Sequence, residues 1–567
     1  MPRPTPTEAA QRTIERLRRY RDENIWIFVR DDRELLADAA SIEARVAAGE
    51  CLPLAGLTFG VKDNIDVAGL PTTAAHPAFA HVPDTHATVV ARLVEAGALL
   101  VGKTNMDQFA TGLVGTRSPY GAVSSSVDAE RVSGGSSSGS AAAVGRGIVD
   151  FSLGTDTAGS GRVPAAFNAI VGLKPTLGLL PLDGVVPACP SYDTVSVFAA
   201  TVGVAAEAMR VAAGESETDP HSRTWSAAAP QGAPDAPIIA VPRAEDLDAL
   251  SPRMRAAFDR AVSRVEEGGS AIVRVDVSSM LDAARLLYDG GLVAERAWSY
   301  GEFLRDHPDS ADPSVSSIAE RAMGTSGTSV IRDQQRLLEL TRRARATLRG
   351  TDALMIPTAP IHPTIAEVQE SPIAVNSVVG TYTNFVNLMD MCAAAVPAEA
   401  VDGEGRFGVS FVAPAFHDQV VADLASRFVG EDAAELGVPG IDVAVFGAHL
   451  RGEPLCGQLV DLGARYLRDV ETAPDFRMKL VEGSPDRPAV VRADEGASLP
   501  GELWRLSPVS LASFLTGIAA PLALGEIGLA DGTTVIGFTA SVAGGEQDIT
   551  HLGGWRAYRA ALAPIAA

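Results

Sequence analysis

Three segments of the chain carry the residue types that acyl-transfer chemistry needs. Residues 59–64 (FGVKDN) contain Lys62, residues 134–140 read GGSSSGS, and residues 154–162 read GTDTAGSGR. In the second and third segments, consecutive small residues at turns leave backbone N–H groups free to line an anion site. An enzyme that attacks a carbonyl carbon needs such groups to stabilise the negative oxygen that forms.

A serine at the end of such a turn can act as a nucleophile, but it needs a base, and no histidine lies near these segments in the sequence. A lysine that burial makes neutral can serve instead. Lysine occurs only four times among 47 basic residues, so the chain uses arginine as its ordinary cation. Arginine stays protonated in proteins, whereas a buried lysine can lose its proton. Three of the four lysines, Lys62, Lys103 and Lys174, lie in the region richest in glycine and serine.

Two other motifs match the sequence patterns of different kinds of site, but the residues around them do not fit those sites. Residues 97–104 (GALLVGKT) match the pattern of a phosphate-binding loop, but the residues between the glycines predict a buried strand, which has no N–H groups to spare. Residues 135–139 (GSSSG) match the nucleophile elbow of α/β-hydrolases, which requires a strand directly before it and a downstream histidine. The preceding DAERVSGG is polar, and His362 and His417 are the only later candidates in the core.

The elements around the three segments predict an α/β core. Residues 5–50 predict helices, and from residue 57 short apolar strands alternate with amphipathic helices. The Gly/Ser run lies between a strand and an Ala-rich helix, where a flexible linker is not expected. The pattern restarts near residues 430–440, and the tail from residue 441 predicts a smaller, β-rich domain (IDVAVFGAHL, TTVIGFTAS).

Composition narrows the class of protein. The chain has 567 residues, 46% of them hydrophobic, and a net charge of -23, which argues against binding to nucleic acid or to anionic membranes. Four cysteines without a CxxC pair predict neither a disulfide framework nor a zinc site. The sequence shows no long uncharged apolar run and no secretory signal, so we expect a cytoplasmic protein that acts on a small molecule without a metal or other cofactor.

With these motifs in their order, the chain resembles the amidase signature family, whose hallmark is a Ser–cis-Ser–Lys triad in a mixed α/β fold. The resemblance implies that Lys62 in VKDN is the base, that Ser136 in GGSS is the cis-serine, and that Ser160 in DTAGS is the nucleophile. The two serines are 24 residues apart, as the family motif requires.

The resemblance also implies the surroundings of the nucleophile. The backbone N–H groups of Thr157, Ala158 and Gly159, with that of Ser160 itself, become the oxyanion donors. Ala158 stands where most members have glycine, which matters little because the donor is the backbone. Asp156 and Arg162, on either side of the turn, are expected to hold the loop.

Further segments resemble the allophanate hydrolase branch of this family: GTRSPYGAV, GVVPAC and GTYTNFVNLMD, and in the tail VAVFGAHLRGEPL and LGGWRAYRAAL. That branch has an extra C-terminal domain related in fold to γ-glutamylcyclotransferases, which predicts domains at 1–435 and 440–567. The resemblance implies that the chain hydrolyses allophanate (urea-1-carboxylate) in urea catabolism, releasing ammonia and a carboxylated product that breaks down to CO2 and ammonia. It further implies a homodimer and a functional link to a urea carboxylase.

Some residues are candidates for contact with the substrate. Tyr288 and Arg296 fit the family's substrate-binding pair by spacing, and Arg296 would meet the substrate carboxylate. The alternative is that Arg296 is one more arginine on a helix surface. Tyr382 and Asn384 either line the pocket or pack beside it. In the tail, His449 is a candidate for the second step, and an ordinary histidine at the end of a strand is the competing interpretation.

Three departures from the close relatives, at Leu177, Pro190 and Cys456, leave the preferred substrate and the activity of the tail open. One alternative is an amidase for biuret, malonamate or an aliphatic amide, with the tail as an oligomerisation module. A second is the amidase component of a tRNA-dependent amidotransferase, which the negative charge does not favour. A third is a non-catalytic scaffold, against which the intact set of Lys62, Ser136 and Ser160 argues.

Overall fold

The computed structural model describes residues 3–483, 485–541 and 546–562. The chain forms two compact units. Unit 1 comprises Met1–Thr224 and Ala236–Gly437, and unit 2 comprises Trp225–Asp235 and Val438–Ala567. Unit 2 includes the segment Trp225–Asp235, which the predicted division into residues 1–435 and 440–567 places in the first domain. No local feature of that segment marks it as part of another unit.

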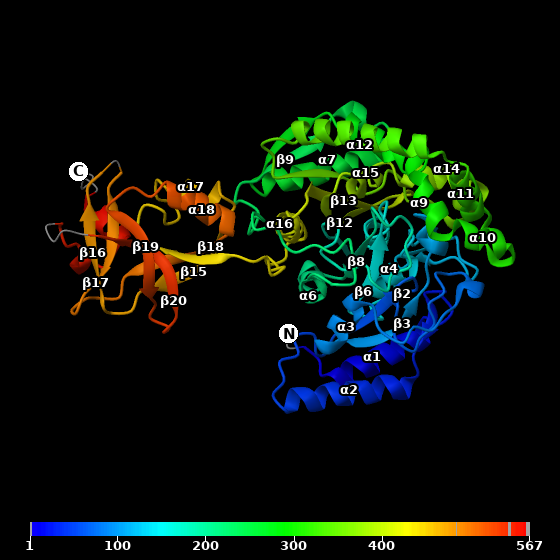
Figure 1. Cartoon of the computed structure of the whole chain (residues 1–567), viewed down its shortest axis with the longest axis horizontal. Coiled ribbons are helices and arrows are strands. Elements are labelled where there is room, and N and C mark those ends of the chain that lie inside the picture. The colour runs from blue at the N-terminus through cyan, green and yellow to red at the C-terminus, as the bar shows by residue number, and fades with distance from the viewer. Residues whose placement is uncertain (1–2, 484, 542–545, 563–567) are drawn as a thin grey trace. The chain divides into compact units, whose positions relative to one another are not determined.

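Unit 1 is built on an 11-stranded mixed sheet with the order β1-β3-β2-β6-β8-β7-β12-β13-β11-β9-β10. Strands β3, β2 and β6 are parallel, as are β11, β9 and β10, and the other neighbours are antiparallel. Figure 1 shows helices on both sides of these strands. The strands are β1 (Trp26–Val29), β2 (Thr58–Lys62), β3 (Leu99–Thr104), β6 (Phe151–Asp156), β7 (Val171–Lys174), β8 (Thr194–Ala199), β9 (Ile238–Pro242), β10 (Ala271–Val275), β11 (Ala353–Pro357), β12 (Met391–Val401) and β13 (Gly405–Pro414); a separate pair is β4 (Ser124–Ser125) and β5 (Asp128–Val132).

Helices of unit 1 cover this sheet. The α-helices are α1 (Pro6–Arg19), α2 (Asp32–Ala47), α3 (Thr88–Glu95), α4 (Ser138–Gly145), α5 (Val163–Phe167), α6 (Val202–Ala212), α7 (Pro252–Glu267), α8 (Ser278–Leu286), α9 (Ala294–Arg296), α10 (Glu302–Asp306), α11 (Pro313–Met323), α12 (Gly327–Thr347), α13 (Ile365–Glu370), α14 (Pro372–Val379), α15 (Asn384–Leu388) and α16 (Asp418–Val429). Short 3-10 or π turns are η1 (Pro77–Phe79), η2 (Gln108–Ala110), η3 (Ala244–Leu247), η4 (Gly291–Val293), η5 (Ala297–Gly301) and η6 (Pro308–Ser310).

The N-terminal region is not helical throughout, which corrects the prediction for residues 5–50. Helix α1 starts at a capping box formed by Thr5 and Glu8, and α2 starts at Asp31, whose side chain accepts from the N–H of Arg33. Between them, strand β1 (WIFV) pairs antiparallel with β3 at the edge of the sheet. Pairing with β3, which is distant in the sequence, satisfies the backbone of this apolar segment, and helical periodicity alone does not reveal such a partner.

Strands β2 and β6 lie side by side in the sheet and are buried along their whole length. Burial of every residue is typical of parallel strands that are covered on both faces. The rings of Phe59 and Phe151 stack across the pair, with centroids 5.1 Å apart. Because parallel strands end at the same edge, Lys62 at the end of β2 and the turn after Asp156 at the end of β6 meet there.

The Gly/Ser run is packed in the interior, which confirms that it is not a linker. Residues 132–144 are all buried. At Gly139 in α4, an added Cβ would come within 2.2 Å of the carbonyl oxygen of Ile25, so only glycine allows this close approach. The small residues therefore seat α4 tightly against neighbouring backbone and hold the residues just before the helix in place.

Unit 2 is β-rich, as predicted. A five-stranded sheet has the order β15-β18-β14-β20-β19, and β16 pairs with β17 as a separate hairpin. The elements of unit 2 are β14 (Ile441–Val445), α17 (Cys456–Val460), β15 (Arg465–Glu471), β16 (Phe476–Val481), β17 (Arg487–Arg492), β18 (Pro500–Leu506), α18 (Pro508–Thr516), β19 (Leu522–Gly528), β20 (Thr534–Ala540), η7 (Thr550–Leu552) and α19 (Trp555–Leu562).

Among the described residues, no helix of either unit is long and apolar enough to cross a bilayer.

Backbone and side-chain hydrogen bonds hold the early segment Trp225–Asp235 in unit 2. The N–H of Gln231 donates to the carbonyl of Gly463 over 2.9 Å, and the side-chain amide of Gln231 donates to the carbonyl of Pro439 over 3.0 Å. The N–H of Val509 donates to the carbonyl of Ala227 over 3.1 Å. These bonds tie the segment to parts of unit 2 that come more than 200 residues later in the sequence.

Candidate active site

The three predicted triad side chains form one chain of hydrogen bonds inside unit 1. Lys62 Nζ lies 2.8 Å from Ser136 Oγ, and Ser136 Oγ lies 3.0 Å from Ser160 Oγ. Lys62 and Ser136 are fully buried, and Ser160 is 2% exposed. A proton can therefore pass from the Ser160 hydroxyl through Ser136 to the lysine without entering bulk water.

Ser136 is held by its backbone. The Gly135–Ser136 peptide bond is cis, and the Ser136 carbonyl accepts from the N–H of Asp107 over 3.0 Å. A Cβ on Gly135 would lie 2.0 Å from Asp107 Oδ2, so the first position of the pair has room only for glycine. The Asp107 carboxylate also accepts from the N–H of Gly115 and Arg117, over 3.0 and 2.9 Å. Asp107 thus connects the loop at residues 115–117 to Ser136. No motif in the sequence indicated this role.

The environment of Lys62 favours its neutral form. Burial lowers the pKa of Lys62 to about 7, although the nearby carboxylates of Asp107, Asp193 and Asp156 oppose the shift. Lys62 Nζ also lies 2.7 Å from Thr155 Oγ1, a contact that the sequence did not indicate. With one N–H donated to Thr155, the nitrogen lone pair of the neutral amine can face Ser136.

The other two lysines of this region have different surroundings. Lys103 is buried in an ion pair with Asp63, with Nζ 3.4 Å from Oδ1. Lys174 is buried as well, and its Nζ donates to the carbonyl of Pro175 over 2.6 Å. Of the three, only Lys62 contacts a serine of the predicted triad.

The turn between β6 and α5 differs in one respect from the expected oxyanion site. The N–H of Gly159 donates to Asp156 Oδ1 over 2.9 Å, so this predicted donor already has a partner. The N–H groups of Thr157, Ala158 and Ser160 donate to no atom in the part of the chain that the structure describes. These three N–H groups are therefore available to an anion, whereas the N–H of Gly159 is used within the turn itself.

A buried ion pair holds the turn, as the sequence predicted. Both Asp156 and Arg162 are fully buried, and two guanidinium nitrogens of Arg162 lie 2.9 Å from the two carboxylate oxygens. The charge of Arg162 keeps the pKa of Asp156 below its usual value in spite of burial. Arg162 also donates to the carbonyl of Thr383 and to Asn387 Oδ1, both over 3.0 Å. The turn is thus anchored to the segment that leads into α15.

Arg296 is fully buried and lacks partners for part of its guanidinium group. Its Nε and one terminal nitrogen have no hydrogen bond within the described chain, and the other donates weakly to the carbonyl of Leu287 over 3.5 Å. The guanidinium carbon lies 4.3 Å from the ring centroid of Tyr288. The two residues predicted to bind substrate are therefore in contact, and the interpretation of Arg296 as a surface arginine is wrong.

Asp193 supports the nucleophile turn and lies within electrostatic reach of Arg296. It accepts from the hydroxyl of Thr157 and from the N–H groups of Ala188 and Cys189. Burial raises the pKa of Asp193 to about 6, and the charge of Arg296 opposes this. Sequence reasoning missed Asp193, although its position in the segment SYDTVSVF, close before strand β8, was a possible signal.

Tyr382 and Asn384 have different roles. The buried Tyr382 donates its hydroxyl to the carbonyl of Asp246 over 3.1 Å, so this group is occupied by a structural contact. In the amide orientation that satisfies both its oxygen and its nitrogen, the side chain of Asn384 donates to the carbonyl of Ala158 over 2.8 Å. Asn384 therefore supports the nucleophile turn.

His449 lies in unit 2 and lines a cavity of about 180 Å³. Its Nε2 is 3.0 Å from Gln458 Oε1, and its ring stacks on Phe538 with centroids 5.0 Å apart. Burial lowers the pKa of His449, so the ring is neutral near pH 7. No group of three or more His, Cys, Asp or Glu side chains suited to hold a metal ion occurs among the described residues of either unit.

Comparison with known proteins assigns both units to families. The Amidase family model matches residues 8–421, and the model of the allophanate hydrolase C-terminal domain matches residues 441–560. The chain belongs to the amidase family. This confirms the predicted family and the predicted fold class, an amidase α/β fold followed by a smaller β-rich domain.

Individual relatives agree with this assignment. A urea amidolyase of Lachancea kluyveri is 38% identical over 94% of this chain, which spans 31% of that protein. These relatives are longer proteins. Nearly the whole of this chain matches them, but it spans only about a third of their length. The crystal structure of a Kluyveromyces lactis allophanate hydrolase is 35% identical, with a TM-score of 0.87, and the match covers 98% of this chain and 97% of that one. A glutamyl-tRNA(Gln) amidotransferase chain of Natronomonas pharaonis is 34% identical, and the match covers 64% of this chain and 93% of that one.

Proposed function

We propose that this amidase hydrolyses allophanate to ammonia and N-carboxycarbamate. Lys62, Ser136 and Ser160 act as base, proton bridge and nucleophile, and the N–H groups of Thr157 and Ala158, with that of Ser160, bind the oxyanion. The relatives that match both units along nearly the whole chain are urea amidolyases and allophanate hydrolases, which supports this substrate over a simple amide.

The geometry allows a complete acyl-transfer cycle. Neutral Lys62 takes the Ser136 proton while Ser136 takes the Ser160 proton, and Ser160 Oγ attacks the terminal amide carbon of the substrate. The negative oxygen binds to the free N–H groups of the turn. When the C–N bond breaks, the proton held by Lys62 returns through Ser136 to the leaving ammonia. Water activated by the same route then cleaves the ester and regenerates the Ser160 hydroxyl.

One observation carries the choice of substrate: the buried, incompletely paired guanidinium of Arg296. A buried charge without a partner is costly, and a carboxylate that binds beside it recovers much of that cost. Asp193 accepts from the hydroxyl of Thr157 in the nucleophile turn and is also within reach of the charge of Arg296, which supports placing the substrate carboxylate at Arg296 and the reacting amide at the turn. Allophanate carries an amide at one end and a carboxylate at the other.

The test compares ammonia release from allophanate, biuret, malonamate and acetamide by the full-length protein, with Ser160→Ala as the blank. We expect allophanate to be preferred, and we expect Arg296→Leu to reduce its kcat/KM about 100-fold, because charge-assisted hydrogen bonds are worth about 1.5–3 kcal/mol each. Biuret, which is neutral, should be much less affected. Arg285→Leu in α8 removes an exposed arginine and is the matched control, with no expected change. A preference for biuret or acetamide would instead favour an amidase of different specificity.

Unit 2 has a separate proposed role. We propose that it assists the breakdown of N-carboxycarbamate to carbamate and CO2, which consumes one proton, before carbamate gives ammonia and a second CO2. His449 is the candidate residue, because it is a neutral histidine beside a cavity. The urea amidolyase relatives support a functional link to a urea carboxylase. A homodimer and a cytoplasmic location stay predictions, which light scattering of the purified protein and cell fractionation test.

A further inference from the structure

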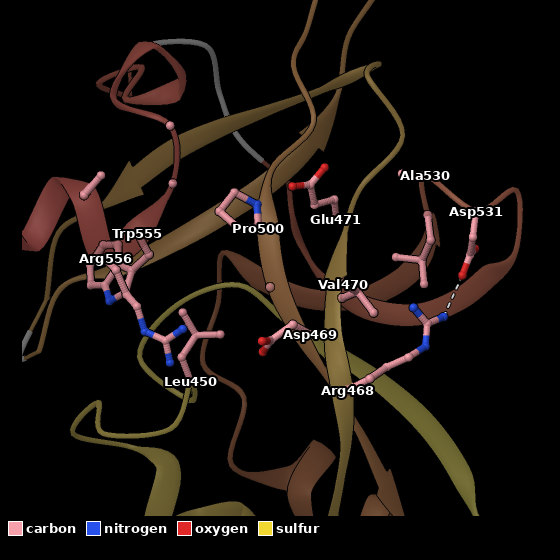
Figure 2. A pocket seen from close by; sticks show the side chains of 15 residues that line it. Leu450, Arg468, Asp469, Val470, Glu471, Pro500, Ala530, Asp531, Trp555 and Arg556 are labelled. Atoms are coloured by element: carbon pink, nitrogen blue, oxygen red, sulfur yellow. Dashed lines mark hydrogen bonds and ion pairs between the residues drawn. The ribbon is translucent and has the colours of Figure 1, made fainter.

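Two cavities, one in each unit, contain charged side chains, but their charges are balanced differently. The cavity in unit 2, of about 680 Å³, is open and has both acidic and basic residues on its wall (Figure 2). Arg468 pairs with Asp531 over 2.6 Å, as the dashed line in Figure 2 shows, and Arg556 pairs with the buried Glu502 over 2.8 Å. Both basic groups are therefore neutralised within the protein.

The cavity in unit 1, of about 370 Å³, has two arginines without a counter-ion on its wall. Arg345 lies in the last turn of α12, and Arg349 follows just after the helix. Their side chains are exposed and make neither an ion pair nor a hydrogen bond with any residue that the structure describes, whereas Arg336 of the same helix pairs with Glu339. The C-terminal end of a helix favours basic residues, which accounts for their position but leaves their N–H groups free for a ligand.

The remaining wall of this cavity adds no negative charge to balance them. Among the described residues that line it, Asp390 is the only acidic one, and Arg223 Nη1 lies 2.9 and 3.0 Å from its two carboxylate oxygens. Asp390 is therefore neutralised by a residue outside the wall. Apart from Thr341, the other lining residues are apolar: Ala344, Leu348, Met389, Met391, Pro414 and Ala415. The cavity thus combines a positive edge with an apolar surface, part of which is made by adaptable methionine side chains.

We propose that this cavity binds a small carboxylate with an apolar body, whose charge pairs with Arg345 and Arg349 while the body lies against Met389 and Met391. Guanidinium groups form strong hydrogen bonds with carboxylates, and the apolar wall gains from being covered. A volume of about 370 Å³ equals that of roughly twelve water molecules, which limits the ligand to about a dozen heavy atoms. A medium-chain fatty acid such as octanoate has this size and chemistry. None of the lining residues belongs to the candidate active site, so binding here does not depend on the proposed function.

The test measures binding of octanoate to the full-length protein by titration calorimetry. The comparison ligands are 1-octanol, which has the chain without the charge, and acetate, which has the charge without the chain. We expect octanoate to bind at least 10-fold more tightly than either, and the double variant Arg345→Gln/Arg349→Gln to remove the preference over 1-octanol. Arg342→Gln/Arg343→Gln is the matched control, because these exposed arginines lie on the same helix and do not line the cavity.

A further variant separates this cavity from any other site that binds octanoate. In Ala415→Trp the indole ring would fill the cavity, while the backbone N–H of residue 415 can still donate to the carbonyl of Asp390, so octanoate binding should fall at least 10-fold. If this variant lowers the thermal midpoint, Thr341→Trp fills the cavity from the side of α12 instead.

Each outcome decides the proposal. It is overturned if octanoate does not bind, if 1-octanol or acetate binds equally well, if the two double variants have the same effect, or if the folded tryptophan variant binds octanoate as the parent does. Because the assay involves no turnover, a protein that proved inactive on allophanate would refute the proposed function without changing this result.

Discussion

Acidification from pH 8 to pH 5 should slow amide hydrolysis about 90-fold, because Lys62 must be neutral to accept a proton. An ordinary lysine, with a pKa of 10.5, is neutral in only about 0.03% of molecules at pH 7. With the pKa lowered by burial to about 7, the neutral fraction of Lys62 is about 0.9 at pH 8, about 0.5 at pH 7 and about 0.01 at pH 5. Activity is therefore retained above pH 7 and lost as the pH falls through 7.

The assay is initial ammonia release as kcat/KM from pH 5 to pH 8.5 at constant ionic strength, with the folded fraction followed by circular dichroism at every pH. Asp193, whose pKa burial raises to about 6, also titrates in this range and should steepen the profile below pH 6. Replacement of Lys62 by methionine should abolish activity at every pH. A profile that is flat between pH 5 and pH 8 in folded protein, or a midpoint above pH 9, would refute the neutral-lysine base.

Three further predictions concern the nucleophile turn. Ser160→Ala should abolish ammonia release while leaving the circular dichroism spectrum unchanged; residual turnover would point to another nucleophile. Gly159→Ala should lower the free energy of unfolding in urea by about 1–3 kcal/mol and activity by more than 100-fold, because φ is +138° and the new Cβ would lie 2.4 Å from Thr383 Oγ1. Arg162→Ala should destabilise by about 3–5 kcal/mol, since the buried carboxylate of Asp156 loses its counter-ion; a loss below 1 kcal/mol would contradict this.

Short segments of the sequence made the triad of the candidate active site predictable. Turns of small residues after apolar strands, and rare lysines in an arginine-rich chain, pointed to the three segments, and the resemblance to the amidase signature family assigned Lys62, Ser136 and Ser160 within them. These signals are local because each depends on the conformation of a few neighbouring residues. The alternation of strands and helices predicted the α/β class for the same reason.

The supporting contacts could not be predicted, because they join residues that are distant in the sequence. Asp107 meets Ser136, and Asn384 supports Ala158, only after the sheet has assembled. Gly159 was expected to offer its N–H to substrate, but the nearby Asp156 carboxylate takes it. Strand β1 was missed because its partner β3 lies about 70 residues later. Such pairings depend on tertiary structure, which overrides local propensity.

The segment Trp225–Asp235 has a consequence for proteolysis. Since the chain enters unit 2 twice, a single cut in the connection near residue 437 would sever the backbone without freeing the C-terminal fragment. The fragment would stay bound through the contacts of Ala227 and Gln231, as two pieces of a nicked protein that co-elute until a denaturant separates them. Release under native conditions would require two further cuts, one on each side of the segment. A protein shortened to end at residue 437 would likewise leave Ala227 and Gln231 without their hydrogen-bond partners in unit 2.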